Sequence, residues 1–240
     1  MNKIHLISGP RNISTALMYS FGNRPDMSIV DEPFYAYYLD QHPDIDHPGR
    51  AETLESQAIQ KETVLSEVIN SNYPTPFVFF KNMAHHMDGM DWTFIEDMKN
   101  VFLIRNPSQL IASFAEVIPN PTMLDIGLKL EYEILQYLIS KEKLPIVIDS
   151  NDILANPQEA LSLLCSRLDL PFKKEMLQWT AGPRKADGVW AKYWYTNVHQ
   201  STGFKIQKTS HKPFPERLTP LLKEANYYYS ELRKFNIYKS

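Results

Sequence analysis

The feature that most constrains the fold is a short apolar run near the start of the chain that breaks at a Gly-Pro pair and gives way to helix-forming residues. Residues 3–8 have strand character, Gly9 and Pro10 interrupt them, and residues 14–18 favour a helix. A strand, turn and helix in this order point the first backbone N–H groups of the helix, and the positive end of its dipole, into the turn. The stretch therefore predicts a loop that binds an anion.

The predicted loop carries a cation and two hydroxyl groups within reach of such an anion. Arg11 offers a planar fork of donors, and Ser14 and Thr15 offer hydroxyls. The nucleotide-triphosphatase pattern is Gly-x4-Gly-Lys-Ser/Thr; the loop keeps Gly9 and the hydroxyl pair but lacks the second glycine and the lysine. It resembles a phosphate loop in form and differs from that of an ATPase. The alternative is an ordinary capped connection between a strand and a helix.

Strand-like and helix-like stretches alternate along the chain. After the first strand, strand-like runs occur at residues 27–33, 77–81, 100–105 and 145–149, and helical stretches lie between and after them. Among these stretches we expect an amphipathic helix at residues 51–71 and a long helix at about residues 123–142. This alternation predicts an α/β fold of the P-loop type, with a mainly parallel sheet and helices on both faces. No repeat or linker interrupts the 240 residues, so we expect a single domain over residues 1–240.

The composition excludes several classes of protein. With 43% hydrophobic and 22% charged residues the chain is expected to be globular, and its net charge of -3 disfavours a general nucleic-acid binder. No apolar run approaches the roughly 18 residues that a membrane span needs. The lone cysteine, Cys165, lies in an apolar run and predicts a buried thiol in a reducing compartment. We therefore expect a cytoplasmic protein without a membrane span; nothing in the sequence indicates its oligomeric state.

Charged residues end three of the predicted strands. Glu32, Lys81 and Arg105 occupy these positions, and Arg11 follows the first strand. Because the carboxyl ends of parallel strands share one edge of the sheet, where ligands bind in such folds, these side chains predict a site for an anionic ligand. The alternative is that Lys81 and Arg105 form structural ion pairs with Glu32 and Asp149.

A stretch rich in histidine and aspartate invites a metal-binding interpretation. His42, Asp44, Asp46 and His47 are all potential ligands. Their spacing fits no common metal-site pattern, so we expect a solvated turn and assign no metal.

Two motifs about ninety residues apart, and a third stretch after them, carry a family resemblance. The first is residues 8–15, and the second is Arg105 followed by Ser113 in a spacing of Arg-x7-Ser. The third is the strand, acidic turn and helix expected in residues 148–172. Together these stretches resemble the sulfotransferases that use 3′-phosphoadenosine 5′-phosphosulfate (PAPS) as the sulfuryl donor. The resemblance covers roughly residues 3–190.

The resemblance implies which residues bind PAPS, whose product is adenosine 3′,5′-bisphosphate (PAP). Arg105 and Ser113 would bind the 3′-phosphate, and a late loop containing Lys185 and Gly188 would cover it. Trp190 or Tyr193 would stack on the adenine; the alternative for these rings is a packed aromatic core. The remaining implied contacts, to the 5′-phosphosulfate, come from the first loop: Gly9, Pro10, Arg11, Asn12, Ile13, Ser14 and Thr15.

The resemblance also implies a base that deprotonates the acceptor. Members acting on small phenols carry a histidine two residues after a strand-end lysine, but here Met83 occupies that position. Glu32, in the sequence Asp-Glu-Pro-Phe, is similar to the glutamate that serves in carbohydrate and several bacterial members. We therefore expect Glu32 to be the base, with His85 or His86 next and Lys81 as a catalytic cation. The alternative for either histidine is a loop side chain bonded to the backbone.

These implications favour a sulfotransferase that acts on the hydroxyl or amine of a small-molecule or carbohydrate acceptor, without a metal. One alternative is a P-loop kinase of small molecules, against which the absent Gly-Lys pair argues. Another is a nucleotide-binding protein of the same fold without catalytic activity.

Overall fold

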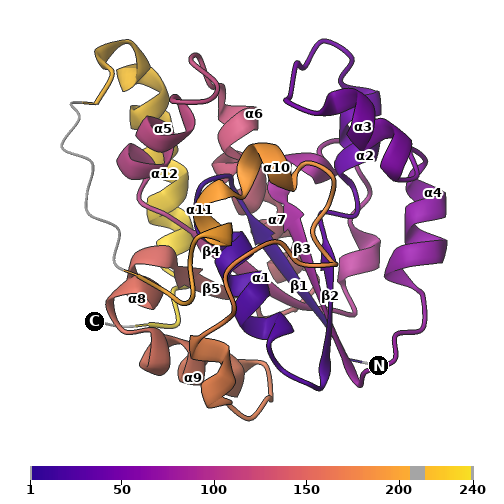
Figure 1. Cartoon of the computed structure of the whole chain (residues 1–240). Helices are drawn as coiled ribbons and strands as arrows, with labels where there is room; N and C mark the ends of the chain where they lie inside the picture. The colour runs from indigo at the N-terminus through magenta and orange to yellow at the C-terminus, as the bar shows by residue number, and fades with distance from the viewer. Residues whose placement is uncertain (1, 206–213, 239–240) are drawn as a thin grey trace.

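The sheet has five strands in the computed structural model, which describes residues 2–205 and 214–238. All the strand pairings are parallel and the order is β2-β3-β1-β4-β5, so β1 is central (Figure 1). The strands are β1 (Asn2–Ser8), β2 (Met27–Asp31), β3 (Phe77–Met83), β4 (Lys99–Ile104) and β5 (Ile146–Asp149). The α/β fold class expected from the sequence is confirmed.

Helices cover both faces of the sheet because successive strand residues point to opposite sides. In β1, Ile4 and Leu6 join one hydrophobic core and Ile7 joins the other. The first core lies under α1 (Ser14–Gly22), α8 (Ser150–Ala155) and α9 (Pro157–Arg167). The second lies under α5 (Pro107–Phe114), α7 (Leu128–Ser140) and α12 (Thr219–Arg233).

Shorter elements complete the described chain. In Figure 1, α10 and α11 lie across the front of the sheet near α1, although they come more than 160 residues later in the sequence. The short helices are α2 (Tyr35–Gln41), α3 (Arg50–Ser56), α4 (Lys61–Val64), α6 (Met123–Ile126), α10 (Ala191–Trp194) and α11 (Thr196–His199). The described chain contains one π-helical turn, η1 (Leu65–Ile69). The 3₁₀-helical turns are η2 (Ala84–Met87), η3 (Thr93–Ile95), η4 (Lys174–Leu177) and η5 (Glu216–Leu218).

The amphipathic helix expected at residues 51–71 is broken into α3, α4 and the π-helical turn η1. The break is at Gln57, whose backbone is extended. Its side chain accepts a hydrogen bond from the Ala36 N–H at 3.1 Å and donates one to the Glu32 carbonyl, also at 3.1 Å. An uninterrupted helix would carry Gln57 away from these two partners, so tertiary contacts override the local pattern here.

The long helix expected at about residues 123–142 is divided by Gly127 into α6 and α7. Gly127 has φ 74°, a left-handed conformation that glycine adopts without steric cost. A Cβ at this position would lie 3.5 Å from the Gly9 Cα and 3.4 Å from the Ala84 Cβ. The break therefore brings the start of α7 against the loop that follows β1.

The register of the sheet determines which strand ends meet. Ser8 of β1 lies opposite Met83 of β3 and Leu103 of β4. Asp31 of β2 lies opposite Lys81 of β3. The loops after β1 and β4 are consequently neighbours, and the carboxylates at the end of β2 face the lysine of β3.

Candidate active site

The loop between β1 and α1 has an unusual backbone conformation. Arg11 and Ile13 have φ values of 59° and 64°, in the left-handed region that non-glycine residues rarely occupy. For a β-branched residue such as Ile13 this conformation costs about 1–3 kcal/mol, and such strain concentrates at ligand-binding sites. Turns of this kind direct backbone N–H groups into a concavity that suits an anion.

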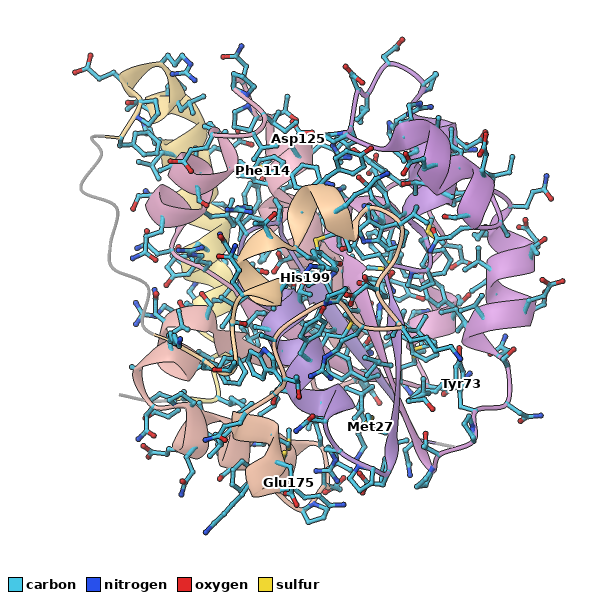
Figure 2. The ribbon with its side chains drawn as sticks, viewed as in Figure 1. Met27, Tyr73, Phe114, Asp125, Glu175 and His199 are labelled. Atoms are coloured by element: carbon cyan, nitrogen blue, oxygen red, sulfur yellow. The ribbon has the colours of Figure 1, made fainter. Side chains whose placement is uncertain are left out.

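A cavity of about 630 Å³ runs along the carboxyl-terminal edge of the sheet. Its lining includes residues 10–16 of the first loop, together with Glu32, Lys81, Arg105 and Ser113. Phe114, at the end of α5, also lines it and lies above His199 of α11 in Figure 2. The first loop and the end of β4 thus open into one cavity.

Arg11, Arg105 and Ser113 are brought together at one end of this cavity. The Nε atom of Arg11 donates to Ser113 Oγ at 3.1 Å, and Arg105 Nη1 donates to the backbone carbonyl of Arg11. Asn12 Nδ2 donates to the Leu103 carbonyl at 2.5 Å and ties the loop to β4. Burial lowers the pKa of both arginines, and the charge of Arg11 lowers the pKa of Arg105 further. Two adjacent, partly desolvated guanidinium groups attract an anion strongly.

Lys81 lies in a buried cluster with Asp31, Glu32 and Tyr195. Its ammonium donates to Asp31 Oδ1 at 2.8 Å, to Glu32 Oε1, and to the Tyr195 hydroxyl at 2.7 Å, and its side chain is 0% exposed. Burial disfavours the ammonium, but the two carboxylates outweigh it and raise the pKa of Lys81. Of the two roles that the sequence left open for Lys81, this geometry favours the ion pair.

Glu32 is held at the end of β2 by its backbone as well as its side chain. Its φ is 43°, its N–H donates to the Lys81 carbonyl at 2.8 Å, and its own carbonyl accepts from Gln57. The carboxylate lines the cavity. Burial raises the pKa of Glu32, and the neighbouring ammonium of Lys81 opposes that shift only in part.

His85 and His86, in η2, are buried side by side against the cavity, with 4% and 1% exposure. Burial lowers the pKa of His85 to about 3 and that of His86 well below its ordinary value, so both imidazoles are neutral near pH 7. Within the described part of the chain, neither Nδ1 atom has a hydrogen-bond partner. The His86 Nδ1 lies 3.8 Å from Glu32 Oε2. The backbone therefore does not satisfy these Nδ1 atoms, contrary to the alternative considered above.

Five residues with predicted nucleotide contacts do not belong to the described lining of the cavity: Gly9, Lys185, Gly188, Trp190 and Tyr193. Lys185 is exposed, and Trp190 is buried against Tyr35, with 5.2 Å between ring centroids. The Gly188 N–H donates to Asp31 Oδ2 at 3.3 Å, and a Cβ at Gly188 would lie 2.2 Å from the Trp190 ring. Trp190 thus forms part of an aromatic core, and the close packing beneath it requires the glycine.

Several residues of the site were not identified from the sequence. Tyr195 joins the Lys81 cluster, and Tyr35, His47 and Trp194 line the cavity. The aromatic richness of residues 34–38 and 190–195 was the available signal for Tyr35, Trp194 and Tyr195. It could not show which ring faces the cavity, because that depends on how the late segment folds back.

Glu131 of α7 is a further buried group behind the first loop. Burial raises the pKa of Glu131 well above its ordinary value. A hydrogen bond from the Gly9 N–H favours the carboxylate and opposes this shift only in part. Burial thus favours the neutral acid, and Glu131 contacts the loop at Gly9, which is not among the residues that line the cavity. Nothing in the sequence around Glu131 distinguishes it from the other charged residues of an amphipathic helix.

Neither a metal centre nor a membrane-spanning helix is found in the part of the chain that the structure describes. Residues 2–205 and 214–238 hold no group of three or more His, Cys, Asp or Glu side chains arranged to bind a metal ion. The helices of the same residues are too short or too polar to cross a membrane.

Comparison with known proteins gives a consistent family signal. The sequence model of a family described as a sulfotransferase domain matches residues 2–234. The fold is similar to the sulfotransferase domain of the Synechococcus PCC 7002 olefin synthase, with a TM-score of 0.60 at 17% identity over 95% of this chain and 94% of that one. It is also similar to a mouse sulfotransferase complexed with PAP, with a TM-score of 0.52 at 15% identity over 100% and 86% of the two chains.

Two curated relatives come from Arabidopsis thaliana and are named branched-chain-amino-acid aminotransferase-like proteins 1 and 2. They are 37% identical over 231 residues and 33% identical over 241 residues, covering 96% and 100% of this chain. The chain spans only 41% and 43% of their lengths. Their names therefore describe proteins more than twice as long as the segment they share with this chain.

Proposed function

The chain belongs to the sulfotransferase domain family, and from this premise we propose that it transfers a sulfuryl group from PAPS to a hydroxyl or amine of a small-molecule or carbohydrate acceptor. The observation that carries the proposal is the meeting of Arg11 and Arg105 beside Ser113 at one end of the cavity. A nucleotide with phosphates at both its 3′ and 5′ positions needs two anion sites close together.

The residues at the ends of β1 and β4 fit such a nucleotide. In this proposal, residues 9–15 hold the 5′-phosphosulfate through backbone N–H groups, the Arg11 guanidinium and the hydroxyls of Ser14 and Thr15. Arg105 and Ser113 hold the 3′-phosphate. The strained loop and the two partly buried guanidinium groups support this assignment, because a bound anion would stabilise both.

The bound nucleotide supplies the sulfuryl group: an acceptor O–S bond forms while the S–O bond to the 5′-phosphate breaks, and the electron pair leaves on that phosphate. We propose Glu32 as the base that takes the acceptor proton. It lines the cavity, and its raised pKa makes it more basic than an ordinary carboxylate. The neutral imidazole of His85, with a pKa of about 3, is a weaker base. Lys81 then orients Glu32 through their ion pair, and Arg11 provides the positive charge at the donor.

The proposal is tested by measuring the affinity of PAP and of ATP by calorimetry, each with and without millimolar Mg²⁺. We expect PAP to bind without the metal and to stabilise the protein by about 2.7 kcal/mol at 100 times its Kd. Tighter binding of ATP that depends on Mg²⁺ would instead favour the kinase alternative.

A pair of variants locates the nucleotide on the protein. Arg105→Ala should weaken PAP binding at least about tenfold, since a charge-assisted hydrogen bond contributes about 1.5–3 kcal/mol. Lys185→Ala, which removes an exposed cation outside the described cavity lining, is the matched control and should bind PAP as the parent does. Equal losses in the two variants would remove the 3′-phosphate assignment.

A further inference from the structure

One part of the cavity has a lining unlike that around the two arginines. Beside Glu32 its walls are aromatic rings, imidazoles and one thioether; we call this part the acceptor compartment, and it is lined by Tyr35, His47, Met83, His85, His86 and Trp194. The rings are contiguous. Tyr35 stacks on His86 at 4.4 Å between centroids, and His47 lies 6.3 Å from His85 and 6.0 Å from Trp194.

The described residues that line the acceptor compartment offer no positive charge to a ligand. The six residues that line it include neither lysine nor arginine. Burial lowers the pKa of His47, His85 and His86, so their rings are neutral near pH 7. Lys81 is the adjacent cation, and it is already bound to two carboxylates. With all three groups ionised, the cluster of Lys81, Asp31 and Glu32 carries a net charge of -1.

An anionic acceptor would therefore enter a buried site whose nearest fixed charge repels it. The energy of two like charges a few ångströms apart reaches several kcal/mol at the effective dielectric constant of a protein surface. Nor could the arginines compensate, because in the proposed function Arg11 and Arg105 are neutralised by the phosphates of the donor. The lining thus disfavours a negatively charged acceptor relative to a neutral acceptor of the same shape.

The acceptor compartment also has hydrogen-bonding capacity that the described protein does not use. The Nδ1 atoms of His85 and His86, two residues of the compartment lining, are buried without a partner among the described residues. The Tyr38 hydroxyl is also buried without such a partner; its ring packs on His85, with 5.0 Å between centroids, but Tyr38 is not itself part of the lining. A buried polar atom without a partner costs about 1–3 kcal/mol. A neutral imidazole nitrogen either donates or accepts according to its tautomer, so a hydroxyl group suits it in both states.

We propose that the acceptor is a small alcohol without negative charge that presents, beside the hydroxyl that is sulfated, a second polar group bonded to His85 or His86. This inference rests on the proposed function and narrows it. It excludes acids, phosphate esters and sugars that are already sulfated, and it places the specificity in the walls of the acceptor compartment.

The expected preference for an acceptor without negative charge is tested with two pairs of hydroxyl compounds. The members of each pair differ by one carboxylate: methyl β-D-glucoside against methyl β-D-glucuronide, and tyrosol against 4-hydroxyphenylacetate. Initial rates are measured with PAPS, and PAP binding is measured separately on the same preparation. We expect the neutral member of a pair to have a kcat/KM at least about tenfold higher. An acid that equals or exceeds its neutral partner overturns the inference.

The separate PAP measurement distinguishes a failure of the acceptor inference from a failure of the proposed function. If PAP binds and none of the four alcohols is either bound or sulfated, the acceptor inference fails while the donor site stands. If PAP does not bind, the proposed function fails, and the inference fails with it.

A variant that adds a cation tests whether charge is the cause. Met83→Lys places an ammonium in the acceptor compartment and should reduce the preference for the neutral alcohol at least about threefold. Met83→Leu is the matched control and should keep the preference. His47→Lys with His47→Gln repeats the comparison on a second wall, in case the Met83 variant does not fold. A preference that is unchanged in a folded lysine variant contradicts the electrostatic explanation.

The hydrogen-bond requirement has its own test. Cyclohexane-1,2-diol should be sulfated with a kcat/KM at least about fivefold above that of cyclohexanol, because only the diol offers a second hydroxyl. Replacing both His85 and His86 with phenylalanine should abolish this preference, with PAP affinity unchanged. A preference for the diol that survives both substitutions rules out the histidines as its source.

Discussion

At the scale of single residues, Glu32 combines three unusual properties. It is buried, its backbone is left-handed, and its carboxylate faces both the Lys81 ammonium and the cavity. Burial and the left-handed backbone are each destabilising, and the Lys81 ammonium offsets part of the cost of the buried charge. Together these properties hold an ionisable oxygen at a defined place beside the proposed donor site. The local sequence could suggest the glutamate, but its ionisation depends on the adjacent Asp31 and on Lys81 and Tyr195, which reach it from two other segments.

The pH dependence of Glu32 follows from the direction of its pKa shift. A base must be deprotonated to act, so a raised pKa moves the acidic limb of kcat/KM to higher pH than the value of about 4.3 for an ordinary glutamate. Glu32→Gln should lose that limb and about 10²- to 10⁴-fold of turnover, while its PAP affinity stays within about threefold.

Exposed Glu175, replaced by glutamine, is the matched control and should behave as the parent protein in both assays. Steady-state rates between pH 4 and 9 check the prediction. If the Glu32→Gln protein retains full turnover, Glu32 is not the base, and His85 or His86 becomes the candidate.

At the scale of elements, the loop after β1 and the break between α6 and α7 are built against each other. Gly9 allows this because it has no side chain. A Cβ there would lie 2.4 Å from the Ile126 carbonyl oxygen, which belongs to the backbone and cannot move independently. The Gly9 N–H bonds to Glu131 from the same side, so the shape of the phosphate loop depends on a helix about 120 residues later in the chain.

Gly9→Ala should consequently destabilise the protein by about 1–3 kcal/mol, the usual cost of inserting a methyl group into close packing. It should also weaken PAP binding, because the loop itself must shift. Urea unfolding and calorimetry measure the two effects.

Gly22→Ala, at the other end of α1, is the matched control. Its new Cβ would meet the side chain of Ile29, at 2.7 Å from Cδ1 and 3.1 Å from Cγ2. A side chain can shift where the backbone oxygen at Gly9 cannot, so the loss in stability should be smaller. Similar losses in the two variants would argue against close packing as the reason for a glycine at position 9.

At the scale of the whole molecule, the segment after residue 178 folds back across the edge of the sheet and is attached there by polar contacts. The Tyr195 hydroxyl bonds to Asp31 at 2.8 Å and accepts from Trp190 Nε1 at 3.1 Å. Asp187 accepts from the Tyr19 hydroxyl at 2.6 Å. One wall of the cavity therefore comes from a part of the chain that is distant in sequence from the other walls.

Tyr195→Phe removes these bonds and leaves part of the buried Asp31–Lys81 cluster unsatisfied. The unfolding free energy should fall by about 1–3 kcal/mol, and the urea midpoint should fall with it. Tyr227→Phe, whose ring is 56% exposed on α12, is the matched control and should change stability by less than about 0.5 kcal/mol. If both variants unfold at the same midpoint as the parent protein, the attachment through Tyr195 is not a source of stability.

The sequence by itself determined the features that arise within a single stretch of chain. Strand-like runs, the glycine-proline turn and the helix after it depend on local propensity and periodicity, and they led to the α/β class and to the family, both of which are confirmed. Charged residues at strand ends were also readable, because parallel strands place their carboxyl ends at one edge. The roles assigned to these residues stay predictions.

Only the tertiary structure decided how distant segments meet. The pairing of Lys81 with Asp31 depends on the register of β2 against β3. The exposure of Lys185 and the burial of Trp190 depend on the path of the late segment, and the break at Gln57 depends on its bonds to Ala36 and Glu32. These outcomes follow from contacts between residues far apart in the chain, whose energies exceed the small local preferences of a helix or a loop.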